Sequence, residues 1–169
     1  MVALIGIDCA TQPNKVGLAL GELDGDCVRI KACRTGNRNE APASIVCSWL
    51  KPGETAVLAL DAPLGWPLAI GRALAGHQAG AAMGATAHSL FRRQCDDEIY
   101  KRFGKRPLEV GANFISRTAV AALDLLADIR SIAGESIPLA WTPADLERIT
   151  AIEVYPAATR LAHRSPGKG

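Results

Sequence analysis

Short apolar runs alternate with polar or glycine-containing breaks along the chain, a pattern typical of an α/β fold. The first apolar run predicts a strand over residues 2–9. A second strand is predicted over residues 15–21 and a third over residues 27–33, with the hairpin signal Asp24-Gly25 between them. Three antiparallel strands are therefore expected to open the fold.

Helices and strands alternate in the rest of the chain. A helix is predicted over residues 41–50, where Pro42 suits the first turn, and a fourth strand runs up to Asp61. The segment 68–86, rich in Ala and Gly, predicts a helix followed by a loop or lid. Further along we expect a helix over 89–103 ended by Gly104, a helix over 113–132, a short helix over 144–148 capped by Thr142, and a strand over 149–155 closed by Pro156.

This order of elements is that of the ribonuclease H-like fold. We expect one α/β domain over residues 1–169, with a central five-stranded mixed sheet whose first three strands are antiparallel, flanked by helices. A helical or lid insertion is predicted at about residues 67–106, after the fourth strand. The helix that usually follows the fifth strand in this fold is expected to be missing.

Two apolar strands each end in an aspartate. Asp61 follows a run whose Ala, Leu and Val side chains predict burial on both faces, and Asp8 ends the first run in the same way. An unpaired carboxylate at such a place is costly, and open α/β sheets bind ligands at the carboxyl ends of their strands. Because the two strands are predicted to be neighbours, Asp8 and Asp61 are expected to share one site. Glu153 lies in the fifth apolar run, where alternation could also turn it outward.

Carboxylate oxygens are the ligands that hard divalent cations accept. A pair of Mg²⁺ or Mn²⁺ ions about 3.5–4 Å apart activates water and stabilises the leaving oxygen of a phosphodiester. For one isolated strand-end aspartate, a cap or an ordinary ion pair is the simpler interpretation. For Asp8 and Asp61 together, the pattern favours a metal site.

A second group of charged residues comprises Arg92, Arg93, Asp96 and Asp97. Arginine guanidinium groups suit phosphate oxygens, and an aspartate beside them could orient an arginine or join the metal shell. The spacing alone favours a simpler interpretation, a solvated helix face with salt bridges.

Composition narrows the class of protein. The hydrophobic content of 49% and the charged content of 21% are those of a globular chain, which excludes disorder as the default. The net charge of +2 is too small to predict non-specific nucleic-acid binding, so any positive surface must be local. Such clusters occur at Arg92-Arg93, Lys101-Arg102 and Lys105-Arg106. Five cysteines without a CxxC pair predict buried reduced thiols and a cytoplasmic protein, and no signal peptide or membrane span is expected.

Four sequence blocks resemble domain-of-unknown-function family 429, whose members are regarded as predicted nucleases of the ribonuclease H-like superfamily. The blocks are GIDCA at 6–10, DAPLGWP at 61–67, FRRQCD at 91–96 and EVYPA at 153–157. The resemblance implies metal binding by Asp8 and Asp61, with Glu153 as a third acidic member.

The family resemblance further implies that Arg93 and Asp96 face the site. Two positions depart from the family pattern: Cys95 stands where a threonine is usual, and the chain ends before a late aspartate.

The function expected from these residues is that of a metal-dependent nuclease, with Mg²⁺ or Mn²⁺ as cofactor and DNA or RNA as substrate. Arg93 would contact the scissile phosphate. An actin-like or sugar-kinase-type phosphotransferase domain is the first alternative, because its first hairpin also follows an aspartate, although such proteins need two domains of this kind. A non-catalytic binding domain on the same fold is the second. The sequence leaves the oligomeric state open.

Overall fold

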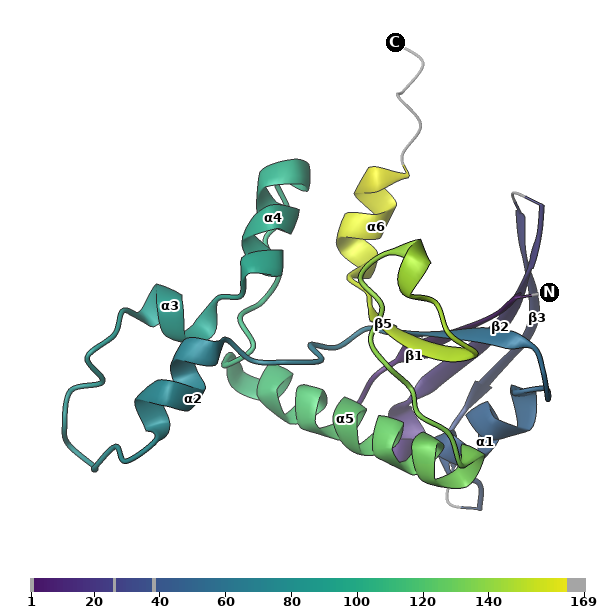
Figure 1. Ribbon diagram of the computed structural model, residues 1–169, viewed down its shortest axis with the longest axis horizontal. Coiled ribbons are helices and arrows are strands. Elements are labelled where there is room, and N and C mark those ends of the chain that lie inside the picture. The colour runs from purple at the N-terminus through teal and green to yellow at the C-terminus, as the bar shows by residue number, and fades with distance from the viewer. Residues whose placement is uncertain (1, 26, 38, 164–169) are drawn as a thin grey trace, which may run out of the picture. The chain divides into compact units, whose positions relative to one another are not determined.

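The computed structural model describes residues 2–25, 27–37 and 39–163 (Figure 1). The chain forms two compact units, each made of two stretches of sequence. Unit 1 comprises Met1–Ala62 and Val120–Val154, and unit 2 comprises Pro63–Ala119 and Tyr155–Gly169. The segment predicted as an insertion, about residues 67–106, lies entirely within unit 2.

Unit 1 is built on a five-stranded mixed sheet with the strand order β3-β2-β1-β4-β5 (Figure 1). Its strands are β1 (Val2–Asp8), β2 (Gly17–Asp24), β3 (Cys27–Thr35), β4 (Thr55–Leu60) and β5 (Ile149–Glu153). β1 pairs antiparallel with β2, and β2 pairs antiparallel with β3. β4 is parallel to both β1 and β5. The predicted α/β class and the mixed sheet with three antiparallel opening strands are confirmed.

The hairpin between β2 and β3 is present where the sequence predicts it. Asp24 pairs with Cys27, and Gly25 adopts a left-handed conformation with φ of +59°, which glycine reaches without a steric penalty. The predicted start of the second strand at Lys15 is wrong. Residues Pro13–Lys15 form a 3-10 helix because Pro13 favours a turn there, and the strand begins at Gly17.

Two helices pack side by side in unit 1. They are α1 (Pro42–Trp49), which starts at a proline as predicted, and residues 120–133 of α5 (Asn113–Ala133). The Cys47 thiol of α1 donates to the carbonyl oxygen of Ile129 in α5 at 3.8 Å. The core contains the fully buried side chains of both helices and the central strands, including Ile5, Leu58, Leu60, Ile45, Val46, Leu126 and Ile129.

Unit 2 is helical and contains α2 (Leu68–Leu74), α3 (Ala87–Phe91), α4 (Gln94–Phe103), α6 (Pro156–Ala162) and the first residues of α5. The single helix predicted over residues 89–103 is wrong, because the chain leaves the helical conformation at Arg92 and Arg93. A new helix starts there because the Asp96 carboxylate accepts a hydrogen bond from the backbone N–H of Arg93. Gly104, with φ of +64°, ends α4 as predicted.

The last part of the chain differs from the prediction in three ways. The short helix expected over residues 144–148 is only a 3-10 turn over Pro143–Asp145, because the Asp145 carboxylate accepts hydrogen bonds from Thr142 and closes the turn early. β5 ends at Glu153, two residues before the predicted limit of 155. Pro156 then begins α6, which carries no acidic residue. The expectation that no helix follows the fifth strand is therefore wrong, because Pro156 suits the first turn of a helix.

Within the described part of the chain, no helix has the length and apolar character needed to cross a bilayer.

Candidate metal centre

The register of three neighbouring strands places three carboxylates at one end of the sheet. Ile7 of β1 pairs with Leu60 of β4, and the backbone N–H of Asp61 donates to the Ile7 carbonyl oxygen at 2.9 Å. Asp8 and Asp61 are therefore the next residues along two parallel strands. Leu60 in turn pairs with Glu153 of β5. The expectation that the ends of the first and fourth strands meet in the middle of the sheet is confirmed.

Asp61 is the most buried of the three carboxylates. Asp61 is half-buried, whereas Asp8 and Glu153 are exposed. Burial raises the pKa of Asp61 above its ordinary value, and the negative charges of Asp8 and then Glu153 raise it further. The three groups therefore repel one another, and a bound cation would relieve that repulsion.

Cys9 adjoins this group, a placement that the sequence analysis did not consider. Its half-buried thiol donates to the Ile7 carbonyl oxygen at 3.7 Å. Burial, followed by the charges of Asp61 and Asp8, raises the pKa of Cys9 to about 12. In the metal-free protein the thiol is consequently protonated at neutral pH. The position of Cys9 directly after Asp8 in the sequence could have indicated that it adjoins this site.

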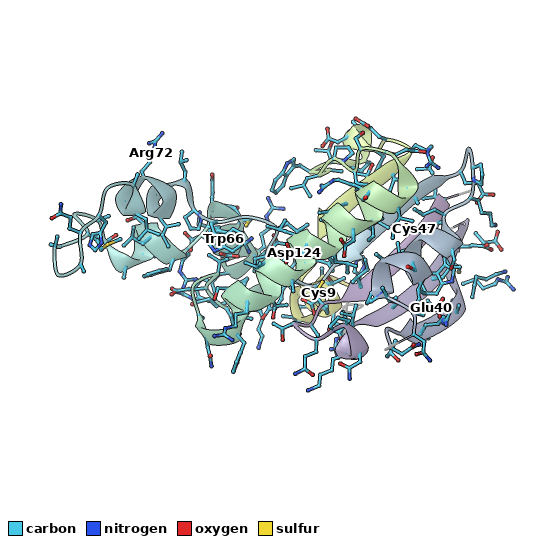
Figure 2. The ribbon with its side chains drawn as sticks, turned by 90° about the horizontal axis from the view of Figure 1, so that it is seen from below. Cys9, Glu40, Cys47, Trp66, Arg72 and Asp124 are labelled. Carbon is cyan, nitrogen blue, oxygen red and sulfur yellow. The ribbon has the colours of Figure 1, made fainter. Side chains whose placement is uncertain are left out.

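A cavity of about 250 Å³ in unit 1 is also lined by Cys9. The loop after β1 contributes Thr11 to its wall, and α1 contributes Pro42. α5 contributes the exposed carboxylates of Asp124 and Asp128, and Figure 2 labels Asp124 and Cys9 among the side chains of this region. Sequence reasoning missed both aspartates, although their spacing of four residues in the otherwise apolar stretch 119–129 predicts a shared helix face.

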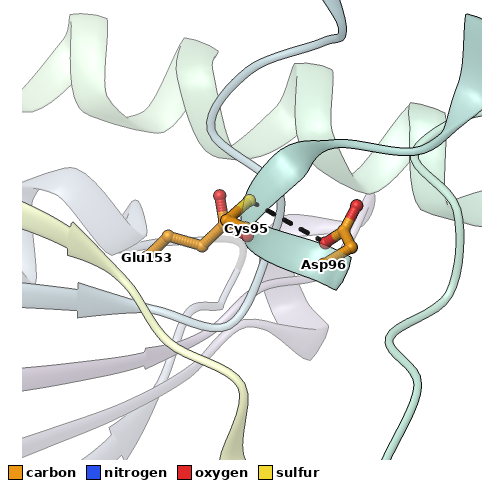
Figure 3. Close-up of side chains that lie close together, drawn as sticks. All are labelled: Cys95, Asp96 and Glu153. Atoms are coloured by element: carbon orange, nitrogen blue, oxygen red, sulfur yellow. Dashed lines mark hydrogen bonds between the residues drawn. The ribbon is translucent and has the colours of Figure 1, made fainter. Parts of the chain in front are cut away.

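Arg93 and Asp96 form a tight ion pair within unit 2. The Arg93 Nε donates to Asp96 Oδ2 at 3.1 Å, and its Nη2 donates to Oδ1 at 2.8 Å. Only 1% of the Asp96 side chain is exposed. The Cys95 thiol lies 4.0 Å from Asp96 Oδ1 (Figure 3). Asp96 therefore holds the Arg93 guanidinium in one orientation, and its proposed place in a metal shell stays a prediction.

Arg92 is buried in a separate ion-pair cluster of unit 2. Its Nη2 donates to Glu109 Oε1 at 2.7 Å, and its Nε lies 3.9 Å from Asp97 Oδ1. His88 Nε2 is 3.4 Å from the other oxygen of Asp97. The interpretation of residues 92–97 as a solvated helix face is wrong for Arg92, because its side chain is only 7% exposed. Among the described residues, Arg92 Nε and Nη1 have no hydrogen-bond partner.

The predicted site residues come from both units. Asp8, Asp61 and Glu153 belong to unit 1, and Arg93 and Asp96 belong to unit 2.

The chain matches the model of a known protein family. The family described as "Protein of unknown function (DUF429)" matches residues 6–166, which is nearly the whole chain. No curated protein and no solved structure matches the chain significantly.

Proposed function

This chain belongs to the DUF429 family of proteins of unknown function, and we propose that it is a metal-dependent nuclease that hydrolyses phosphodiester bonds in nucleic acid. The observation that carries the proposal is the strand register that sets Asp8, Asp61 and Glu153 at one end of β1, β4 and β5. The order of strands and helices supports a ribonuclease H-like fold as part of the same proposal.

The donor set fits a hard divalent cation. Asp8 and Asp61 would hold Mg²⁺ or Mn²⁺ through carboxylate oxygens, and Glu153 would complete the acidic group. Carboxylate oxygens suit these two ions better than zinc, which favours thiolate and imidazole ligands. When bound, the ion lowers the pKa of a coordinated water and stabilises the leaving oxygen.

In this proposal, Arg93 contacts the scissile phosphate. A guanidinium group presents its N–H donors in a planar fork that matches phosphate oxygens. Asp96 supports that role because its two oxygens fix the plane of the Arg93 guanidinium. A group held in one orientation loses less conformational entropy when it meets its ligand.

The expected compartment is the cytoplasm. The five cysteines are all free thiols, as in proteins of reducing compartments. Their predicted burial is only partly right, because Cys27 and Cys33 are exposed on β3, where most side chains face solvent.

A nuclease assay with the Asp61→Asn variant tests the proposal. Cleavage of single- and double-stranded DNA and RNA is measured with Mg²⁺ and with Mn²⁺. The variant keeps the shape of the side chain and removes one anionic ligand. We expect activity to fall by at least ~100-fold, since loss of an outer-shell partner alone costs about 10–100-fold.

The matched control is Asp24→Asn. Asp24 is an exposed aspartate of the same sheet, and it forms a salt bridge with Arg29 at 3.5 Å. We expect the control to keep full activity. Equal activity of the wild type and the Asp61→Asn variant would contradict the assignment.

A further inference from the structure

Seven consecutive exposed residues follow one another at the end of α4. This basic segment, residues 100–106, has the sequence YKRFGKR and contains no acidic residue. Its four cations are Lys101, Arg102, Lys105 and Arg106, and two aromatic residues, Tyr100 and Phe103, lie between them. Cations interleaved with exposed aromatic rings are typical of surfaces that bind single-stranded nucleic acid.

The fold holds the two halves of this segment together. Gly104, in its left-handed conformation, turns the chain directly after α4. The turn brings the Arg106 guanidinium over the Tyr100 ring, with Cζ 4.1 Å from the ring centroid. A cation–π contact uses the face of the guanidinium, so its N–H donors at the edge remain suited to phosphate oxygens.

α6 adds a further cation to the same unit. α4 and α6 are in contact within unit 2. The hydroxyl of Tyr155, which precedes α6, donates to the Arg106 carbonyl oxygen at 3.5 Å. α6 carries the exposed Arg160 and no acidic residue. The basic segment and Arg160 therefore belong to one cationic region of unit 2.

Only part of this charge has a local explanation. Glu98 lies 2.9 Å from the Lys101 ammonium and 3.9 Å from Arg102 Nε. Both cations also lie in the last turn of α4, where the helix dipole favours positive charge. In the part of the chain that the structure describes, no carboxylate forms an ion pair with Lys105, Arg106 or Arg160. These three exposed cations are therefore available to an anionic ligand.

We propose that the basic segment and Arg160 form a binding surface for single-stranded nucleic acid. Lys105, Arg106 and Arg160 contact phosphates, and the exposed rings of Phe103 and Tyr100 stack on bases. Lys105 and Arg106 lie in the turn after α4 and Arg160 lies in α6. The three cations therefore do not line the polar face of one amphipathic helix, which favours a nucleic-acid backbone over an anionic membrane. The choice of ligand rests on the proposed function, but the binding residues are separate from Asp8, Asp61 and Glu153.

The test is fluorescence anisotropy with a labelled oligothymidylate of about 20 nucleotides, a length above the ~4–16 nucleotides that one binding fold occupies. EDTA is present, so the measurement does not depend on metal or on cleavage. Affinity is measured between about 50 and 200 mM salt, because each phosphate contact to a single strand contributes about −0.7 to the slope of log K against log salt. The variants are Lys105→Gln and Arg160→Gln.

Each variant is expected to bind several-fold more weakly and to lower the magnitude of the slope by about 0.7. The control is Lys31→Gln in β3, an exposed lysine that pairs with Glu22 at 3.2 Å and should leave binding unchanged. Wild-type slopes in both variants would overturn the proposal. It would also be overturned if the protein bound phosphatidylserine vesicles more tightly than the oligothymidylate and the two variants weakened that binding. Binding that survives in an inactive Asp61→Asn protein separates this surface from the nuclease assignment.

Discussion

Asp61 opposes the stability of the metal-free protein. Its pKa is raised by burial and by the charges of Asp8 and Glu153, so the folded state binds a proton at this position more strongly than the unfolded state does. The free energy of unfolding therefore falls as the pH rises from the ordinary pKa of an aspartate, about 3.9, to the raised value. Above the raised value the penalty is fully present, and below the ordinary value it is absent.

The Asp61→Asn variant should consequently be more stable than the wild type at neutral pH when EDTA removes metal. We expect a small rise in Tm, because solvent screens part of the repulsion at this half-buried carboxylate. At about pH 3, below the ordinary pKa, the difference should disappear. Thermal unfolding followed by circular dichroism at both pH values measures it, with Asp24→Asn as the control. A variant that is less stable than the wild type at neutral pH would contradict the electrostatic account.

At the scale of secondary structure, the break between α3 and α4 depends on a single carboxylate. The apolar and charged periodicity of residues 89–103 fits one continuous helix, so the sequence pattern carried no signal for a break. Asp96 overrides that pattern because it accepts hydrogen bonds from both the backbone N–H and the side chain of Arg93. The non-helical conformation at Arg93 follows from this local pairing, which periodicity does not report.

Replacing Asp96 by alanine should strongly destabilise the protein. The change removes the cap of α4 and the hydrogen bonds that Asp96 accepts from the side chain of Arg93, which is 11% exposed. Breaking a buried ion pair from one side costs about 3–5 kcal/mol, and loss of a cap costs about 1 kcal/mol. Urea denaturation should therefore show a lower midpoint.

The control for Asp96→Ala is Glu98→Gln, a change to an exposed ion pair on the same helix that should leave the urea midpoint almost unchanged. A midpoint for Asp96→Ala equal to that of this control would show that the Arg93–Asp96 pair does not hold α4 in place.

For the molecule as a whole, the sequence predicts what local patterns encode. The strand ends at Asp8 and Asp61 could be placed because each apolar run stops at a carboxylate, and the antiparallel opening follows from Asp24-Gly25. The cavity lined by Asp124 and Asp128 could not, because it forms only when α5 packs beside α1 and the loop after β1. Residues distant in sequence create such a cavity, so the hydrophobic periodicity of a single segment cannot predict it.

The different proposed roles of the acidic and the basic residues predict different kinetic effects. Asp8, Asp61 and Glu153 are proposed to act in the chemical step, whereas Lys105 and Arg160 are proposed only to bind substrate phosphates. An interaction made equally in the ground state and in the transition state lowers KM without changing kcat. The Lys105→Gln/Arg160→Gln double variant should therefore show a KM raised by roughly tenfold and an unchanged kcat, since two phosphate contacts are lost.

Steady-state cleavage of a single-stranded oligonucleotide measures this division, with Asp61→Asn as the opposite case, in which kcat falls and binding persists. The effect of the double variant on KM should shrink as salt is raised, because screening weakens the contacts that it removes. A fall in kcat for the double variant, with KM unchanged, would place Lys105 and Arg160 in the chemical step and refute their assignment to substrate binding.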